Sequence, residues 1–395
     1  TIAAPGSPAQ WSAPQGSRRV KKDSGFICIA QNAFRHPESP LEPLFRSLYS
    51  EQPSFDINSI DVVTDRNNIR MLLSFINPTK KSWEPFTIQV DMAAQTAILC
   101  RDETATFEVI KPGQSRGFGR EFEKAYTVAQ IKGSTGHHRI ISYRLGGLSF
   151  LVRHETDGYV DNLKPAVKSD ESTENNLTDM LKSLSLSPET ASTGETFVQS
   201  KLTIKREGRV IPLESTLEIK TRTAGKHLRL REVAPQLWVS QTPKLVRAYH
   251  RHGEFSMPIV EDVTAQVKDW ERAYQDDIRK LIALINDILR VTRNWGGSST
   301  IRYDPLKDKL VIKKVERKKM LPDDLYSRWT KIIPATVAQK ISEQGPAPTQ
   351  KSDNQGSTNA LDKDEALSSG FKAEPTQLRP EENVATATLV NKSEP

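Results

Sequence analysis

The sequence predicts a mixed α+β fold, a central mixed β-sheet flanked by helices in a single domain. Three observations support this: several runs of alternating apolar and polar residues, two segments with helical spacing of apolar residues, and no internal repeat. The 395 residues are only 36% hydrophobic and their mean hydropathy is −0.54, which is low for a chain that folds throughout. We therefore expect a folded core together with solvated segments.

The composition limits the classes of partner and compartment. Lysine and arginine total 56 against 49 aspartate and glutamate, so the net charge is +7, which allows a polyanionic partner without identifying one. Cys28 and Cys100 are too few for a disulfide framework, and no Cys/His grouping has zinc-ligand spacing. The longest apolar stretch, 281–289, is too short for a membrane span. We expect a nuclear or cytoplasmic protein that is neither secreted nor membrane-bound.

The first half of the chain predicts a basic arm followed by strands and helices. Residues 1–24 are rich in Pro, Gly and Ser and include four basic residues, so a disordered basic arm is expected ahead of a folded domain over 25–333. A helix capped by Thr64 or Asp65 is expected to end before Pro78. The other expected elements are strands at 60–63, 86–90, 97–100 and 106–110, a helix at 121–132, and a hairpin over 140–154 turning at Gly146 and Gly147.

The second half contains an insertion, further strands and the longest expected helix. Ser, Thr, Glu and Asn dominate residues 162–199, which predicts a disordered insert. Strands are expected at 201–205, 210–221, 244–250 and 309–315, and apolar residues at steps of three and four predict one helix over 262–293. Residues 334–395 have the composition of a disordered tail.

The strand at 210–221 contains the first pattern that suggests chemistry. Glu218 and Lys220 point to the same side because side chains alternate along a strand. A carboxylate beside a lysine suits metal-dependent phosphodiester cleavage, since the carboxylate binds a hard divalent ion and the lysine orients water and offsets anionic charge. The alternative is a surface ion pair on a strand.

A second acidic pattern ends the apolar strand at 148–152. Glu155 and Asp157 also share a side, and Gly158 follows them. If this strand end lies beside Glu218, the three carboxylates make an oxygen-ligand cluster for Mg²⁺ or Mn²⁺. Otherwise they are an ordinary acidic strand end before a loop.

The order of these patterns resembles that of PD-(D/E)xK nucleases. The acidic strand end, the Glu-x-Lys strand and then Gln241 ahead of the next strand look, more narrowly, like the motifs of the eukaryotic RNA 5′-end decapping nuclease and pyrophosphohydrolase family, over residues 115–260. The resemblance implies that Glu155, Asp157 and Glu218 bind the divalent metal. It also implies that Lys220 positions the nucleophilic water and that Gln241 supports the centre.

Two further groups of residues follow from this hypothesis. The family has an upstream Gly-x-x-x-Glu element, for which residues 119–123 are a candidate, with Glu123 as a weaker candidate ligand. Arg116, Arg120 and Arg153 lie near the carboxylates in sequence and are expected to bind RNA phosphate. The expected partner is the 5′ end of an RNA.

The whole chain also looks similar to an uncharacterised ascomycete family often labelled geranylgeranyl pyrophosphate synthetase. Prenyl synthases bind diphosphate through two Asp-Asp-x-x-Asp helical motifs. The segments that begin at Asp276 and Asp323 both lack the last aspartate, and the many expected strands contradict an all-α fold. We expect a metal-dependent RNA 5′-end hydrolase, of decapping nuclease or pyrophosphohydrolase type. The alternatives are a non-catalytic RNA-binding or scaffold protein with a nuclease-like fold and, less favoured, a geranylgeranyl diphosphate synthase.

Overall fold

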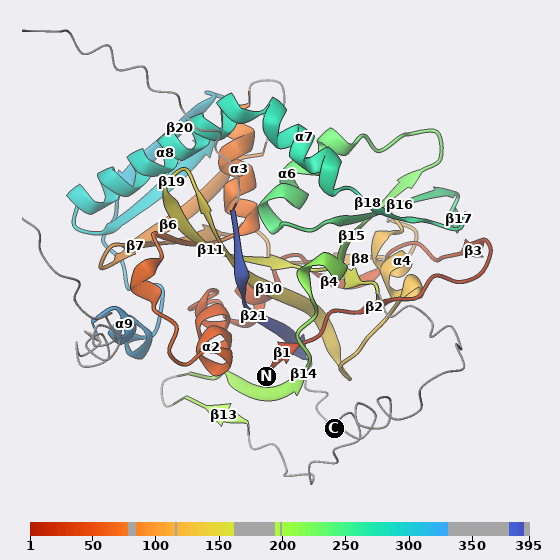
Figure 1. Ribbon diagram of the computed structural model, residues 1–395, viewed down its shortest axis with the longest axis horizontal. Coiled ribbons are helices and arrows are strands. Elements are labelled where there is room, and N and C mark those ends of the chain that lie inside the picture. The colour runs from red at the N-terminus through yellow and green to blue at the C-terminus, as the bar shows by residue number, and fades with distance from the viewer. Residues whose placement is uncertain (78–83, 115–116, 162–193, 198–199, 331–378, 391–395) are drawn as a thin grey trace, which may run out of the picture.

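The larger of the two main β-sheets forms the centre of the fold (Figure 1). This computed structural model describes residues 1–77, 84–114, 117–161, 194–197, 200–330 and 379–390. Eleven described strands form the larger sheet, in the order β13-β14-β1-β21-β10-β11-β5-β7-β6-β19-β20. Their bounds are β1 Ile2–Gly6, β5 Val62–Asp65, β6 Phe86–Ala93, β7 Thr96–Asp102, β10 Ser134–Leu145, β11 Leu148–Glu155, β13 Glu195–Thr196, β14 Thr203–Gly208, β19 Ser298–Asp304, β20 Lys309–Lys314 and β21 Arg379–Val390.

The pairing in this sheet is mixed. β5 runs parallel to both β11 and β7, and β1 runs parallel to β14. The other pairs are antiparallel, including the hairpin of β10 and β11, in which Leu145 lies opposite Leu148. Gly146 and Gly147 turn this hairpin with positive φ angles of 58° and 82°, which glycine adopts without strain. A side chain on Gly146 would also collide with Ile282, so the turn needs glycine for space as well.

A second sheet of eight strands lies beside the first, and a two-stranded sheet accompanies it. The order is β3-β17-β16-β15-β12-β2-β9, with β18 also paired to β16, while β4 pairs with β8. The bounds are β2 Gln10–Trp11, β3 Arg18–Arg19, β4 Gly25–Cys28, β8 Phe107–Ile110, β9 Thr127–Val128, β12 Gly158–Tyr159, β15 Thr216–Thr223, β16 Lys244–Arg251, β17 Glu254–Phe255 and β18 Val260–Asp262. The chain passes from the larger sheet to the second one between β11 and β12.

Helices cover both faces of the larger sheet because its strands bury alternate residues on opposite sides. Val62 packs with α3, α6, α7 and α8, whereas the next residue, Val63, packs with α2 and α9. The bounds are α1 Gln31–Arg35, α2 Glu42–Glu51, α3 Arg66–Ile76, α4 Gly119–Tyr126, α6 Leu230–Ser240, α7 Thr264–Ala273, α8 Gln275–Asn294 and α9 Asp323–Thr330, with short 3₁₀ turns η1 Ile57–Ser59 and η3 Leu213–Ser215. None of the described helices has the length and apolar character to cross a bilayer.

The predicted mixed sheet flanked by helices is confirmed, and most expected elements are present. The expected helix over 262–293 is two helices, α7 and α8, because the backbone leaves the helical conformation at Tyr274 (φ −110°, ψ 22°). The tyrosine ring stacks on Trp270 at 5.0 Å between ring centroids. Apolar spacing continues through this break, so periodicity alone could not reveal it.

The expected disordered segments differ in part from the structure. Residues 1–24 contain the buried strand β1, with Ile2 only 1% exposed, and the short strands β2 and β3, so the prediction of a disordered arm over 1–24 is wrong. Three small residues at 3, 4 and 6 made the segment look like a linker, but their small side chains suit a tightly packed strand. In the predicted tail 334–395, residues 379–390 form β21. The remaining residues of the predicted tail lie outside the described residues. Of the predicted insert over 162–199, the structure describes only residues 194–197.

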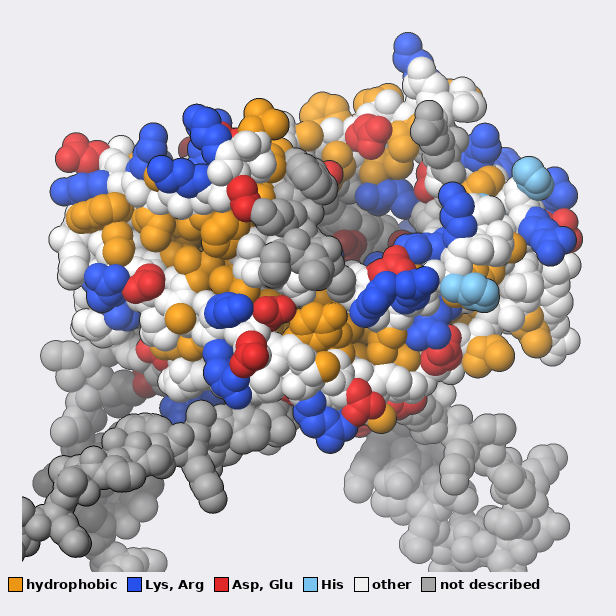
Figure 2. Space-filling view, turned by 90° about the horizontal axis from the view of Figure 1, so that it is seen from above, with side chains coloured by type: hydrophobic (Ala, Val, Ile, Leu, Met, Phe, Trp, Pro, Cys, Tyr) orange, Lys and Arg blue, Asp and Glu red, His pale blue; other side chains and the backbone are white. Residues whose placement is uncertain are grey.

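The outer surface above α7 and α8 is charged with both signs (Figure 2). Asp276 pairs with Arg279 and Asp287 with Arg290 on this helix, so Asp276 serves a local ion pair. Asp324 at the start of α9 instead pairs across the fold with Arg46 of α2. With its extensive sheets, this fold is not the all-α fold of a prenyl synthase and lends no support to that label.

Candidate functional site

Asp157 and Glu218 lie side by side where the chain passes between the two sheets. β12 pairs antiparallel with β15, so that Gly158 lies opposite Leu217 and the residue before Gly158 is brought to Glu218. The backbone N–H of Ile219 donates to Oδ2 of Asp157 at 2.7 Å, which holds this carboxyl group against β15. The adjacency on which the predicted site depends is therefore present in the structure.

Glu218 is the most enclosed carboxylate of this group, with the whole residue only 2% exposed. Lys220 Nζ and Gln236 Nε2 both donate to its Oε1, and Arg66 Nη1 donates to its Oε2 at 3.3 Å. Burial favours the protonated acid, but the charges of Lys220 and Arg66 outweigh it and lower the pKa of Glu218 to about 2. Glu218 is thus a fixed anion at the centre of the site.

The pKa values of the three carboxyl groups around Glu218 shift in the opposite direction. Burial, followed by the negative charge of Glu218, raises the pKa of Asp157 well above its usual value. Burial and then neighbouring carboxylates raise the pKa of Glu123 to about 7, and burial raises the pKa of Glu155. Asp157 and Glu218 also share a hydrogen bond. Four acidic residues from α4, β11, the β11–β12 link and β15 therefore act on one another at close range.

The glutamine that touches this group is Gln236, not the predicted Gln241. Gln236 lies inside helix α6 and reaches Glu218, whereas Gln241 caps the end of that helix with a positive φ of 52°. Among the described residues, Nε2 of Gln241 is buried without a hydrogen-bond partner. Sequence reasoning placed Gln241 by its position before the next strand and overlooked the helix.

The three predicted phosphate-binding arginines have different positions. Arg116 lies outside the described residues. Arg120 lines both cavities of the site and donates to the carbonyl of Cys28 at 3.1 Å. Arg153 is buried and forms a two-pronged pair with Asp65 at 2.6 and 2.9 Å, so its guanidinium is already engaged in the fold. Arg66, which the sequence analysis missed, is the arginine that contacts the carboxylate group.

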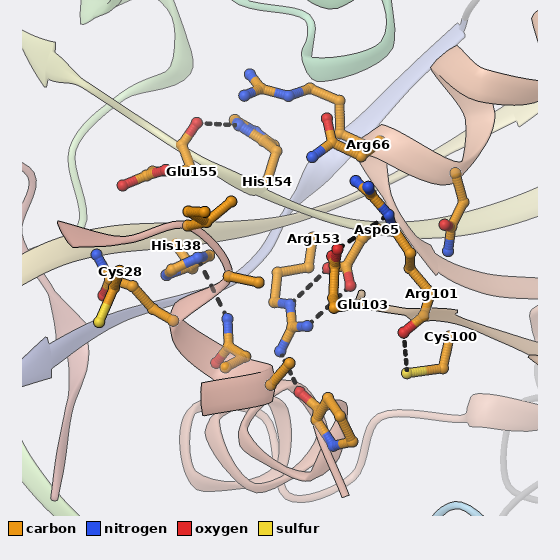
Figure 3. Close-up of a pocket in the computed structure, with 18 of the residues that line it drawn as sticks. Cys28, Asp65, Arg66, Cys100, Arg101, Glu103, His138, Arg153, His154 and Glu155 are labelled. Carbon is orange, nitrogen blue, oxygen red and sulfur yellow. Dashed lines mark hydrogen bonds and ion pairs between the residues drawn. The ribbon is translucent and has the colours of Figure 1, made fainter. Parts of the chain in front are cut away.

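Two cavities border the acidic group. The larger has a volume of about 620 Å³, and Glu123, Glu155 and Asp157 line it together with Arg35, Arg120 and Lys124. The smaller has a volume of about 140 Å³ and is shown in Figure 3, where Glu155, His154 and Arg66 lie at one end and Arg153 and Asp65 pair near its middle. Glu155 and Arg120 line both cavities, so the two meet at the carboxylates.

Gly136 lies close to the side chains of both Gln31 and Glu155. A Cβ at this position would lie 2.8 Å from Nε2 of Gln31 and 3.2 Å from Oε1 of Glu155. A side chain at position 136 would therefore displace the end of the Gln31 side chain and crowd the carboxyl group of Glu155.

The residues fit a hard divalent cation by their chemistry, although their present arrangement does not form a finished ligand set. Within the described ranges, no group of three or more His, Cys, Asp or Glu side chains is positioned to hold a metal ion. Lys220 and Gln236 both donate hydrogen bonds to Oε1 of Glu218, and Asp157 is hydrogen-bonded to the same carboxylate. The oxygen donors and the raised pKa values of three of the four acids show a site where added positive charge would be stabilised.

The solved structures with a similar fold include proteins from two yeasts. Candida albicans Rai1 in complex with pU5 and Mn²⁺ is 11% identical with a TM-score of 0.51, over 82% of this chain and 89% of that chain. Scheffersomyces stipitis Rai1 in complex with (3′-NADP)⁺ and calcium ion is 11% identical with a TM-score of 0.50, over 83% and 90%. At this identity the likeness extends to the fold alone.

The chain was also compared with curated proteins and with family models. The comparison with curated proteins gives no match. One family model covers residues 1–329, well over half of the chain. Its description is a domain of unknown function, DUF8563, and the chain belongs to this family.

Proposed function

We propose that this protein is a metal-dependent hydrolase that acts on RNA 5′ ends, of decapping nuclease or pyrophosphohydrolase type. The observation that carries the proposal is the group of Glu123, Glu155, Asp157 and Glu218 beside Lys220, bordering a cavity of about 620 Å³. The fold around it is similar to that of a Rai1 structure solved with pU5 and Mn²⁺. Perturbed acidic groups in a cleft are typical of a site with chemistry.

The four carboxylates would hold Mg²⁺ or Mn²⁺, with Asp157 and Glu218 nearest the centre. A bound divalent cation supplies a Lewis acid and a lowered pKa for bound water. Lys220, held by Glu218, places a positive charge where water is oriented and where anionic charge develops on phosphate. Gln236 keeps Glu218 in one orientation through its amide.

The larger cavity would receive the RNA. Arg35, Arg120 and Lys124 line it together with three of the acids, which gives a phosphate chain positive charge beside the negative centre. Arg153 has a positioning role in this proposal, because its guanidinium holds Asp65 and the carbonyl of Pro40.

The direct test is turnover of 5′-triphosphate, 5′-monophosphate and capped RNA with Mn²⁺, Mg²⁺ or EDTA. Wild-type protein is expected to give metal-dependent products, and Glu218→Gln is expected to reduce the rate by at least about 100-fold. Glu42→Gln is the matched control, since Glu42 is also buried and paired with an arginine but lines neither cavity. Products formed equally by Glu218→Gln would remove the site from the proposal.

A second candidate is a non-catalytic RNA-binding protein that keeps the nuclease-like fold. The observation that favours it is the ion-paired state of Glu218, which Lys220 and Arg66 satisfy without any metal. This candidate predicts salt-sensitive RNA binding in EDTA and intact RNA under every metal condition. The same assay therefore separates the two.

A further inference from the structure

Three phenylalanine rings form an exposed aromatic patch near the larger cavity. Phe26 from β4, Phe34 from α1 and Phe107 from β8 are 55%, 39% and 47% exposed. Their ring centroids lie 5.2 to 5.6 Å apart, so each ring contacts the other two. Contact of these three large apolar side chains with water is unfavourable, and their burial against a ligand would be favourable. A contiguous exposed apolar patch of this kind is typical of a binding surface.

The patch is continuous with the cavity that leads to the acids. Phe26 and Phe34 line that cavity themselves, together with Arg35, Arg120 and Lys124. Glu155 and Asp157 line the same cavity. A phosphate chain whose end reaches these carboxylates would therefore lie in a cavity that the basic side chains and two of the rings also line.

Cations beside exposed aromatic faces match single-stranded nucleic acid more closely than they match a protein surface. Basic groups attract the phosphates, and flat rings offer faces on which bases stack in place of water. Phenylalanine has no donor or acceptor, so such contacts do not select a base by hydrogen bonding. They favour the larger surface of a purine.

We propose that the aromatic patch of Phe26, Phe34 and Phe107 is a stacking platform for the bases of single-stranded RNA downstream of its 5′ end. This inference rests on the proposed function, because it takes RNA as the ligand of the same cavity. The platform holds the RNA while its terminus lies at the acids. It makes binding tolerant of sequence and stronger for adenylate than for uridylate.

The test is binding of 5′-phosphorylated hexa-adenylate in EDTA, where no metal-dependent turnover occurs. A second oligonucleotide has the same phosphates but abasic sugars after the first nucleotide. The double variant Phe26→Leu with Phe34→Leu keeps apolar side chains but removes two aromatic faces, whereas Phe34→Trp enlarges one. Ile259→Leu, at an exposed apolar position that lines neither cavity, is the matched control.

The double variant is expected to bind hexa-adenylate roughly 5- to 100-fold more weakly, and the Phe34→Trp and control variants at least as tightly as wild type. The abasic oligonucleotide is expected to bind all four proteins alike. Equal binding of hexa-adenylate by wild type and the double variant would overturn the platform, and the rings would then be left to a protein partner. RNA turnover by wild type in that case would still support the proposed function, whereas no RNA binding by any of the proteins would contradict both.

Discussion

Gln236 is a residue of the site that the sequence did not predict. The resemblance pointed to Gln241, because this glutamine lies just before the strand that is now seen as β16. Pro235 is unfavourable inside a helix because it lacks an N–H, so the sequence did not suggest helix α6. In the folded chain α6 nevertheless forms, and Gln236 faces Glu218. By contrast, Glu218 and Lys220 could be paired in advance, because strand alternation fixes their common side.

We expect Gln236→Ala to reduce turnover of 5′-end RNA by about 10- to 100-fold while the metal requirement persists. The reason is that Glu218 loses the amide donor that orients it. Gln241→Ala is the matched comparison and should stay within a few-fold of wild type. Steady-state rates with Mn²⁺ measure both, and a larger loss in Gln241→Ala would restore the original prediction.

The buried imidazole of His138 makes the stability of the protein depend on pH. Burial, followed by nearby arginines, lowers the pKa of this imidazole to about 3, and its Nε2 lies 3.2 Å from Nδ2 of Asn32. The folded protein thus keeps His138 neutral, while the unfolded chain takes up a proton near pH 6.5. The contribution of His138 to the free energy of unfolding is therefore fully present above about pH 6.5, and it is lost as the pH drops from there toward 3.

Between pH 7 and pH 5 this one group is expected to cost about 2 kcal/mol of the free energy of unfolding. Urea unfolding at the two pH values measures the loss, with His252→Gln, at an exposed turn position, as the control. His138→Gln should lose less stability than wild type over the same interval. An equal loss in that variant would assign the pH response to other groups.

At the scale of elements, local patterns gave the strands and helices whose neighbours are close in sequence. The hairpin of β10 and β11 needed only alternation and two glycines. β1 was missed because its residues are small and its partners, β14 and β21, come some 200 and nearly 400 residues later. No local pattern reports such a pairing, since its stability comes from burial between distant strands.

The buried position of β1 can be tested with Ile2→Ala. Ile2 is part of a small apolar cluster with Ala4, Leu202 and Ile204, so its truncation should cost about 2 to 4 kcal/mol in the free energy of unfolding. Ile259→Ala, at a residue 73% exposed, should change stability by less than about 0.5 kcal/mol. Unfolding in urea measures both, and equal midpoints would contradict an ordered β1.

At the scale of the whole molecule, the acidic group exists because two sheets meet. Asp157 lies in the link between β11 of the larger sheet and β12 of the second, and Glu218 lies on β15. The sequence contained both patterns, but the pairing of β12 with β15 spans the long insert between them. Their proximity is a property of the assembled sheets and was therefore a condition of the prediction, not a result of it.

The distribution of charge over the molecule predicts the salt dependence of RNA binding. If Arg35, Arg120 and Lys124 contact phosphates, the logarithm of the binding constant should fall with the logarithm of salt concentration with a slope of about −2. Arg120→Gln should reduce that slope by about 0.7, because it removes one contact. Lys307→Gln, at a residue that lines neither cavity, should leave it unchanged. Titrations at several salt concentrations measure the slopes, and a slope near zero would argue against phosphate contacts.

The position of β21 has a consequence for the order in which the protein can be completed during synthesis. β21 lies between β1, at the start of the chain, and β10, yet it is the last described strand to be translated. While the ribosome is still making the preceding residues, the gap between β1 and β10 has no strand to fill it. The larger sheet can therefore close between β1 and β10 only after residues 379–390 have emerged, and until then two rows of backbone hydrogen-bonding groups stay open to water or to a chaperone.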